Sequence, residues 1–140
     1  MTPEKLMELA TEAMENSYSP YSGYRVGAAL VCADGRVYTG CNIENAAFSP
    51  TVCAERCAIF KAVSEGRREF CAIAVVGGRA GETPGRAAPC GVCRQVMGEF
   101  CGRDFKIYLL NSGGGIDEYT LDSLLPQRFG GESVVRGHRG

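Results

Sequence analysis

The chain has 140 residues and a mass of 14.9 kDa, with 15 Lys plus Arg against 16 Asp plus Glu, for a net charge of −1. This length predicts one domain, residues 1–140, that can bury its own core, and the balanced charge argues against a nucleic-acid partner. Hydrophobic residues make up 45% and charged residues 22%, which excludes a disordered or fibrous chain. The apolar runs fall far short of the roughly 20 residues of a membrane helix, and the N-terminus does not resemble a secretory signal. We therefore expect a cytoplasmic protein with no membrane partner.

The N-terminal third of the chain predicts a helix followed by a β-hairpin. Thr2 before Pro3 is typical of a helix start, and the apolar residues that follow fall on one helical face. After a turn-rich segment, β-rich stretches over residues 25–33 and 36–42 flank Asp34-Gly35. Asp-Gly between two such stretches is the strongest short-range signal for a hairpin.

The rest of the chain predicts helices and strands in alternation. In chain order they are a helix over residues 51–65, a strand over 70–77, a helix over 89–101, a strand over 105–110 and a helical turn over 121–125. The two strands, joined through a helix, should be parallel with a right-handed crossover. This order predicts an α/β layered domain that ends in a tail over residues 127–140.

Three of the eight cysteines lie at spacings that predict a metal site. Cys90 and Cys93 form a C-x-x-C pair after Pro89, and Cys53 lies two residues before Glu55. Both groups are at expected helix starts, where unpaired N–H groups stabilise thiolates. This arrangement resembles the signature of zinc deaminases, with cysteine in place of the first histidine. A thioredoxin-like redox pair is the weaker interpretation. That motif follows an early strand, whereas here the C-x-x-C pair follows two expected helices and a hairpin.

Three protein ligands would leave the fourth position of a zinc ion to water, as in catalytic sites. Glu55, otherwise an ordinary first-turn glutamate, could then take a proton from this water and return protons to the substrate. Three thiolates make the centre negative, so we expect Arg56 and Arg94 to hydrogen-bond the sulfurs. The alternative for both arginines is an exposed position on the surface.

A fourth protein ligand would instead indicate a structural zinc module. Cys57 lies one helical turn after Cys53 and could close the site, whereas His138, the only histidine, lies close to the C-terminus. We consider both poor candidates. Cys57 and the remaining cysteines are instead expected to be small buried hydrophobic residues; the others are Cys32, Cys41, Cys71 and Cys101.

Over nearly its whole length the chain resembles the small, homotetrameric, zinc-dependent cytidine deaminases. The matching stretches are Pro20-Tyr21-Ser22, residues 26–30, residues 40–47, Cys53-Ala54-Glu55-Arg56 and residues 89–95. The resemblance implies a three-layer α/β/α fold with a mixed five-stranded sheet. It also implies hydrolytic deamination of cytidine and 2′-deoxycytidine to uridine and 2′-deoxyuridine, with release of ammonia, as in pyrimidine salvage.

The same resemblance implies a role for individual residues. Cys53, Cys90 and Cys93 would hold one Zn²⁺ per chain, and Glu55 would shuttle protons. The substrate-binding positions are Asn42 and Glu44 at the ribose 3′-hydroxyl, Tyr24 and Ala54 near the pyrimidine, and Phe48 and Phe129, which reach a neighbouring subunit's active site. The family usually has phenylalanine at Tyr24 and tyrosine at Phe48. The resemblance therefore also implies a homotetramer with shared active sites.

Two further interpretations remain open. Blasticidin-S deaminase shares the cysteine and glutamate pattern, but residues 42–46 match the ribose-binding stretch of nucleoside deaminases. Editing of a polynucleotide is disfavoured, since the sequence offers no basic channel for a strand. The loop over residues 79–88 and the tail over 133–140 do not match the family closely, and we assign them no role.

Overall fold

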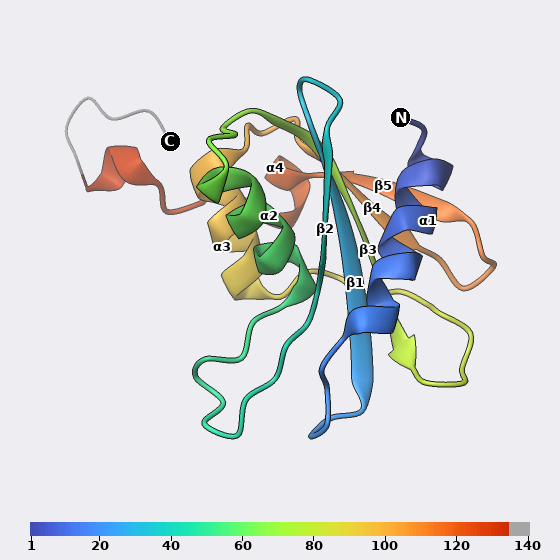
Figure 1. Cartoon of the computed structure of the whole chain (residues 1–140). Coiled ribbons are helices and arrows are strands. Elements are labelled where there is room, and N and C mark those ends of the chain that lie inside the picture. The colour runs from blue at the N-terminus through green and yellow to red at the C-terminus, as the bar shows by residue number, and fades with distance from the viewer. Residues whose placement is uncertain (135–140) are drawn as a thin grey trace.

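The structure, a computed structural model, describes residues 1–134 and is built on a mixed five-stranded sheet (Figure 1). The strands are β1 (Tyr24–Cys32), β2 (Val37–Cys41), β3 (Phe70–Arg79), β4 (Lys106–Leu110) and β5 (Ile116–Thr120), in the spatial order β2-β1-β3-β4-β5. β3 and β4 are parallel, and the other neighbours are antiparallel. The mixed five-stranded sheet and the parallel pair are thus confirmed.

Helices cover both faces of this sheet. They are α1 (Pro3–Ala13), α2 (Ala54–Ser64), α3 (Gly91–Phe100) and α4 (Leu121–Leu124), with 3₁₀ turns η1 (Met14–Asn16) and η2 (Gly131–Ser133). One apolar core lies under α1, and a second joins α2, α3 and α4 to the other face, which confirms the three-layer α/β/α fold (Figure 1). Within residues 1–134, no helix is both long and apolar enough to span a bilayer.

The hairpin between β1 and β2 forms where Asp34-Gly35 predicts it. Gly35 has a φ of +89°, in the left-handed region that glycine adopts at little cost. The Asp34 carboxylate accepts a hydrogen bond of 3.1 Å from the Arg36 N–H. The turn therefore sets the register, in which Leu30 faces Tyr38.

Strand β5 is the element that the sequence pattern did not predict. Its residues, Ile-Asp-Glu-Tyr-Thr, are all partly or fully exposed, so the strand has no run of buried apolar positions. The antiparallel ladder with β4, from Lys106↔Thr120 to Leu110↔Ile116, stabilises it. It occupies the edge of the sheet next to β4.

Helices α2 and α3 begin three and two residues later than expected, respectively. Val52 instead pairs with Ile43 through two backbone hydrogen bonds of 3.0 Å, so the chain stays extended up to Cys53. Cys53 is the N-cap of α2 and Cys90 the N-cap of α3, both with extended backbone. The two helix starts lie at the same end of the molecule, which brings the cysteines together (Figure 1).

Candidate metal centre and substrate pocket

The sulfur atoms of Cys53, Cys90 and Cys93 all lie within 4.8 Å of one another. The Sγ atoms of Cys53 and Cys90 are 3.7 Å apart. Tetrahedral zinc with Zn–S bonds of about 2.3 Å requires a sulfur–sulfur separation of about 3.8 Å, so the donor set fits this metal. A tetrahedral zinc ion held by these three sulfurs would keep its fourth position for another ligand.

Arg56 lies against this sulfur cluster, as the sequence predicted. Its Nη2 donates a hydrogen bond of 3.4 Å to Cys53 Sγ. Hydrogen bonds from Cys93 and from Arg56 lower the pKa of the Cys53 thiol to about 5. The guanidinium thus offsets negative charge at the sulfurs, which stabilises the thiolate form that binds metal.

Arg94 makes its hydrogen bonds to main-chain carbonyls. Its Nε donates to the oxygen of Pro89 at 2.8 Å, and its Nη1 donates to the oxygen of Leu124 at 2.9 Å. Because Pro89 directly precedes Cys90, Arg94 fixes the backbone that delivers this cysteine. The sequence predicted a hydrogen bond from Arg94 to a sulfur, but these two bonds are to main-chain carbonyls.

Glu55 is buried beside the cysteines on the first turn of α2, with 3% of its surface exposed. Burial raises the pKa of its carboxyl group to about 7, and the neighbouring Cys53 charge acts in the same direction. A carboxyl group with such a pKa exchanges protons readily at neutral pH. This environment is what a proton-transferring residue needs.

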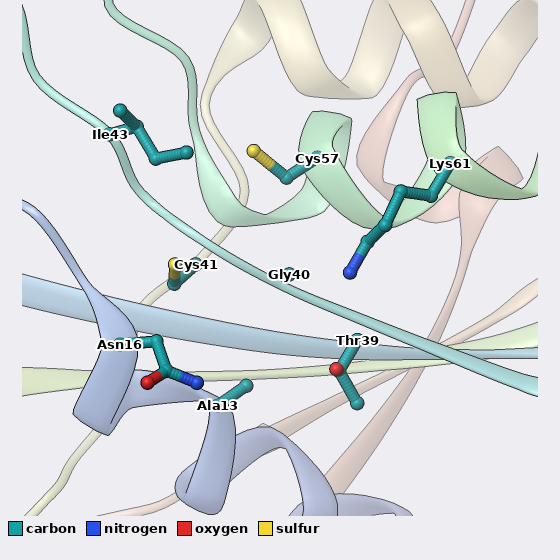
Figure 2. A pocket seen from close by; sticks show the side chains of 8 residues that line it. All are labelled: Ala13, Asn16, Thr39, Gly40, Cys41, Ile43, Cys57 and Lys61. Carbon is teal, nitrogen blue, oxygen red and sulfur yellow. The ribbon is translucent and has the colours of Figure 1, made fainter.

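Cys57 lies in a different cavity, at the open edge of β2. This cavity has a volume of about 370 Å³ and lies between the end of α1 and helix α2 (Figure 2). Its lining residues are Ala13, Asn16, Thr39, Gly40, Cys41, Ile43, Cys57 and Lys61. Within residues 1–134 the cysteine cluster therefore contains three ligand atoms, and Cys57 is not among them. His138 lies outside the described residues.

Glu44 lines a cavity of about 280 Å³ together with Tyr21, Ser22, Phe48 and Thr51. Its carboxylate accepts hydrogen bonds from the N–H groups of Tyr21 (3.0 Å) and Ser22 (3.1 Å) and from the Ser22 hydroxyl. These bonds, with the Ser22 side chain first, lower the pKa of Glu44. The turn at Tyr21-Ser22 thereby fixes a charged acceptor at the cavity wall.

The side chain of Asn42 is buried and connects three backbone segments. Its Oδ1 accepts from the Val26 N–H at 2.9 Å and from the Ser17 hydroxyl, and its Nδ2 donates to the Tyr24 carbonyl at 2.8 Å. Asn42 therefore holds the start of β1 in place beside Glu44. Sequence reasoning did not assign a role to Ser17 or Ser22, because serines in a turn-rich segment give no signal of their distant partners.

The ring of Tyr24 lies over Gly77. A Cβ atom at Gly77 would lie 2.5 Å from the Tyr24 hydroxyl and 2.9 Å from the Cβ of Ala87. Burial and the nearby Glu55 carboxylate raise the pKa of Tyr24, so the ring and the metal-side carboxylate share one neighbourhood. Ala54, the first residue of α2, is fully buried beside them.

Phe48 and Phe129 present their rings to solvent, with 72% and 61% of their surfaces exposed. Phe48 has a φ of +61°, and its ring meets that of Tyr21 edge-on, with centroids 6.5 Å apart. Hydrogen bonds from Phe48 to Asn45 and from Thr51 to Phe48 close the turn around it. The structure thus holds Phe48 at the rim of the Glu44 cavity.

Comparisons with known proteins show the family of the chain. Residues 1–109 match the family model for the zinc-binding region of cytidine and deoxycytidylate deaminases. The cytidine deaminase of Sporosarcina psychrophila is 51% identical over 134 residues, 96% of each chain, and that of Halalkalibacterium halodurans is 50% identical over 96% of this chain and 98% of its own. A crystal structure of cytidine deaminase from Burkholderia pseudomallei has a TM-score of 0.84 and 48% identity, covering 92% of this chain and 100% of the other. The chain belongs to the family of zinc-binding cytidine and deoxycytidylate deaminases.

Proposed function

We propose that the protein converts cytidine and 2′-deoxycytidine to uridine and 2′-deoxyuridine by hydrolysis, releasing ammonia. The observation that carries this proposal is the buried carboxyl group of Glu55, with a pKa raised to about 7, beside the three clustered cysteines. The names of the full-length relatives support cytidine as the substrate. We treat residues 1–140 as one catalytic domain.

We assign the metal to Cys53, Cys90 and Cys93, with one Zn²⁺ per chain. When bound, zinc supplies Lewis acidity that activates a water molecule as the nucleophile. Glu55 accepts a proton from the attacking water and returns protons to the ring and to the departing amino group. The C4–O bond forms, the C4–N bond breaks, and nitrogen leaves as ammonia. Arg56 keeps negative charge from accumulating at the sulfurs.

We assign the nucleoside to a site that reaches from the three cysteines to the cavity lined by Glu44. Tyr24 and Ala54 would contact the pyrimidine, while Glu44 and Asn42 would bind the ribose 3′-hydroxyl. A carboxylate is a good acceptor for a sugar hydroxyl and repels phosphate, so it favours a nucleoside over a nucleotide. The buried amide of Asn42, whose Nδ2 already donates to Tyr24, retains one N–H for a ligand.

We infer that the active enzyme is a homotetramer with shared active sites. Phe48 and Phe129 are large exposed aromatic residues that would be buried against neighbouring subunits. Each ring would complete the pocket of an adjacent chain. All eight cysteines are free thiols, as suits the reducing cytoplasm.

The first test is the loss of cytidine absorbance with purified protein, together with a zinc assay of the same sample. We expect turnover to uridine with about one zinc per chain, the content of a site with one set of three ligands. Glu55→Gln should retain zinc and lose about 10²- to 10⁴-fold in kcat, because amide cannot transfer the proton. Zinc without turnover of cytidine but with turnover of blasticidin S would favour the alternative substrate. Retained activity in Glu55→Gln would contradict the assigned role.

A further inference from the structure

The end of α4 and the segment that follows it are held against α3 by hydrogen bonds and packing. From α3, Arg94 donates a hydrogen bond of 2.9 Å to the Leu124 carbonyl. From the segment after α4, Arg128 donates a hydrogen bond of 3.3 Å to the carbonyl of Cys101, at the end of α3. Between these contacts Leu125 packs against Gly98, where a Cβ atom would lie 3.1 Å from Leu125 Cδ2. The sequence predicted a tail from residue 127, but this part of it follows a fixed path.

Gln95, on α3, makes the contact with this segment that lies furthest along the chain, at Phe129. Its Nε2 donates a hydrogen bond of 2.9 Å to the main-chain carbonyl of Phe129. Gln127 has a φ of +55°, an unfavourable conformation for a residue with a side chain, and it turns the chain so that Phe129 returns to α3. The backbone conformation at Phe129 therefore depends on the contacts that α3 supplies.

The backbone of Phe129 is fixed, yet its ring is 61% exposed. Val92, one helical turn before Gln95 on α3, is 57% exposed. An exposed ring on a fixed backbone is well suited to bind another surface. A residue whose backbone is already held in place loses little conformational entropy on binding. Given the shared active sites proposed above, that surface is the substrate pocket of a neighbouring copy of this chain.

We propose that Gln95 is a positioning residue that sets the place of Phe129 in the active site of the neighbouring subunit. The inference rests on the proposed function. Gln95 lies two residues after the metal-binding candidate Cys93 on the same helix. One helix then carries a metal ligand for its own site and the support of an aromatic residue for the next site.

The first experiment compares Gln95→Ala, Gln95→Glu and Phe129→Ala. Gln95→Glu keeps the size of the side chain but removes the donor. Both Gln95 variants should raise KM for cytidine about two- to tenfold, the effect of one lost hydrogen bond, with kcat and zinc content unchanged. In the Phe129→Ala background, Gln95→Ala should add nothing. An equal effect in both backgrounds, or a loss of zinc, would overturn the proposal.

The second experiment asks which subunit the effect reaches. Gln95→Ala chains and catalytically inactive Glu55→Gln chains are co-expressed with different tags, and mixed tetramers are purified through both. If Gln95 acts across the interface, some sites with an intact Glu55 receive Phe129 from a chain with an intact Gln95. A fraction of sites with the wild-type KM should then appear.

A KM in the mixed tetramers equal to that of Gln95→Ala alone would mean that Gln95 acts within its own subunit, which contradicts the proposal. The wild-type protein serves as the reference in both experiments. If it fails to deaminate cytidine, the proposed function is wrong. If it is active while the variants behave independently, only the role of Gln95 is wrong.

Discussion

At the scale of single residues, Glu44 shows how a turn sets the charge of a carboxylate that is proposed to bind the ribose. The hydroxyl and N–H of Ser22 and the N–H of Tyr21 donate to Glu44 and lower its pKa. A lowered pKa keeps the group ionised, and so able to accept a ribose hydroxyl, down to a lower pH. The affinity for substrate should therefore persist into the acidic range.

Ser22→Ala tests this link between the turn and the carboxylate. Loss of the hydroxyl removes the largest cause of the lowered pKa, so the pKa of Glu44 rises toward its usual value. As pH falls, KM for cytidine should then begin to increase at a higher pH in Ser22→Ala than in the wild type. The measurement is KM from neutral to acidic pH. Ser64→Ala, which removes an exposed hydroxyl on α2, is the control, and identical profiles for all three proteins would refute the link.

Arg56→Ala tests the charge balance at the cysteines. The variant loses the guanidinium that donates to Cys53 Sγ, so the thiolates are less well compensated. Removal of such an outer partner typically costs about 10- to 100-fold in metal affinity or activity, and we expect a loss in this range. The checks are kcat for cytidine and zinc content. Arg68→Ala is the matched control, because Arg68 is exposed and donates to the carbonyls of Val63 and Arg67. Equal kcat and zinc affinity in both variants would contradict the role of Arg56.

Local spacing predicted which cysteines cluster better than it predicted the residues that support them. Cys53 and Glu55 are two positions apart, and Cys90 and Cys93 three, so each pair lies within the length of one turn at a helix start. The partners of Arg94 could not be predicted in the same way, because Leu124 is 30 residues away and offers only a carbonyl. A main-chain acceptor leaves no trace in the side-chain sequence.

At the scale of elements, Gly40 determines how closely α2 approaches the sheet. A Cβ atom at this position would lie 2.6 Å from the Ala58 nitrogen and 2.8 Å from Cys57 Cβ, closer than side-chain atoms pack. The missing side chain lets the first turn of α2 rest on β2. That turn carries Glu55 and follows directly on Cys53.

Gly40→Ala should therefore affect both stability and metal binding. We expect a loss of about 1–3 kcal/mol in the free energy of unfolding, the usual cost of overpacking, and reduced zinc content because Cys53 moves away from Cys90. Chemical denaturation and a zinc assay measure the two effects. Gly102→Ala is the control, since a Cβ there meets no atom within 4 Å and the backbone is not left-handed. A Gly40→Ala protein with wild-type stability would show that α2 can shift without cost.

The elements that the sequence predicted are those with local signals. Thr2 caps α1 by accepting a hydrogen bond from the Lys5 N–H, and Asp34-Gly35 forms the hairpin turn. Strand β5 lacked such a signal, because its side chains are not buried and its pairing with β4 provides the order. The start of α2 was misjudged for a related reason, since Val52 pairs with Ile43 instead of entering the helix.

At the scale of the whole molecule, several large apolar side chains of the single chain are exposed to solvent. They include Tyr18, Tyr21, Ile43, Phe48, Val92 and Phe129, each at least 45% exposed. Apolar surface of this kind marks an interaction face, because leaving large rings in water is unfavourable. Phe48 lies at the rim of the Glu44 cavity. We therefore expect the protein to be active only when a neighbouring subunit covers this rim.

Assembly should then be a condition for activity but not for folding. Phe48→Glu would place an unpaired charge in the proposed interface, at a cost of several kcal/mol, and should yield a folded monomer. We expect that monomer to keep zinc and to lose most of kcat/KM for cytidine, while Phe48→Tyr, the residue usual in the family that the chain resembles, keeps assembly and activity. Analytical ultracentrifugation, circular dichroism and the deaminase assay on the same samples separate these effects. Full activity in a monomeric Phe48→Glu would mean that each chain completes its own site, because no neighbouring ring would then be needed.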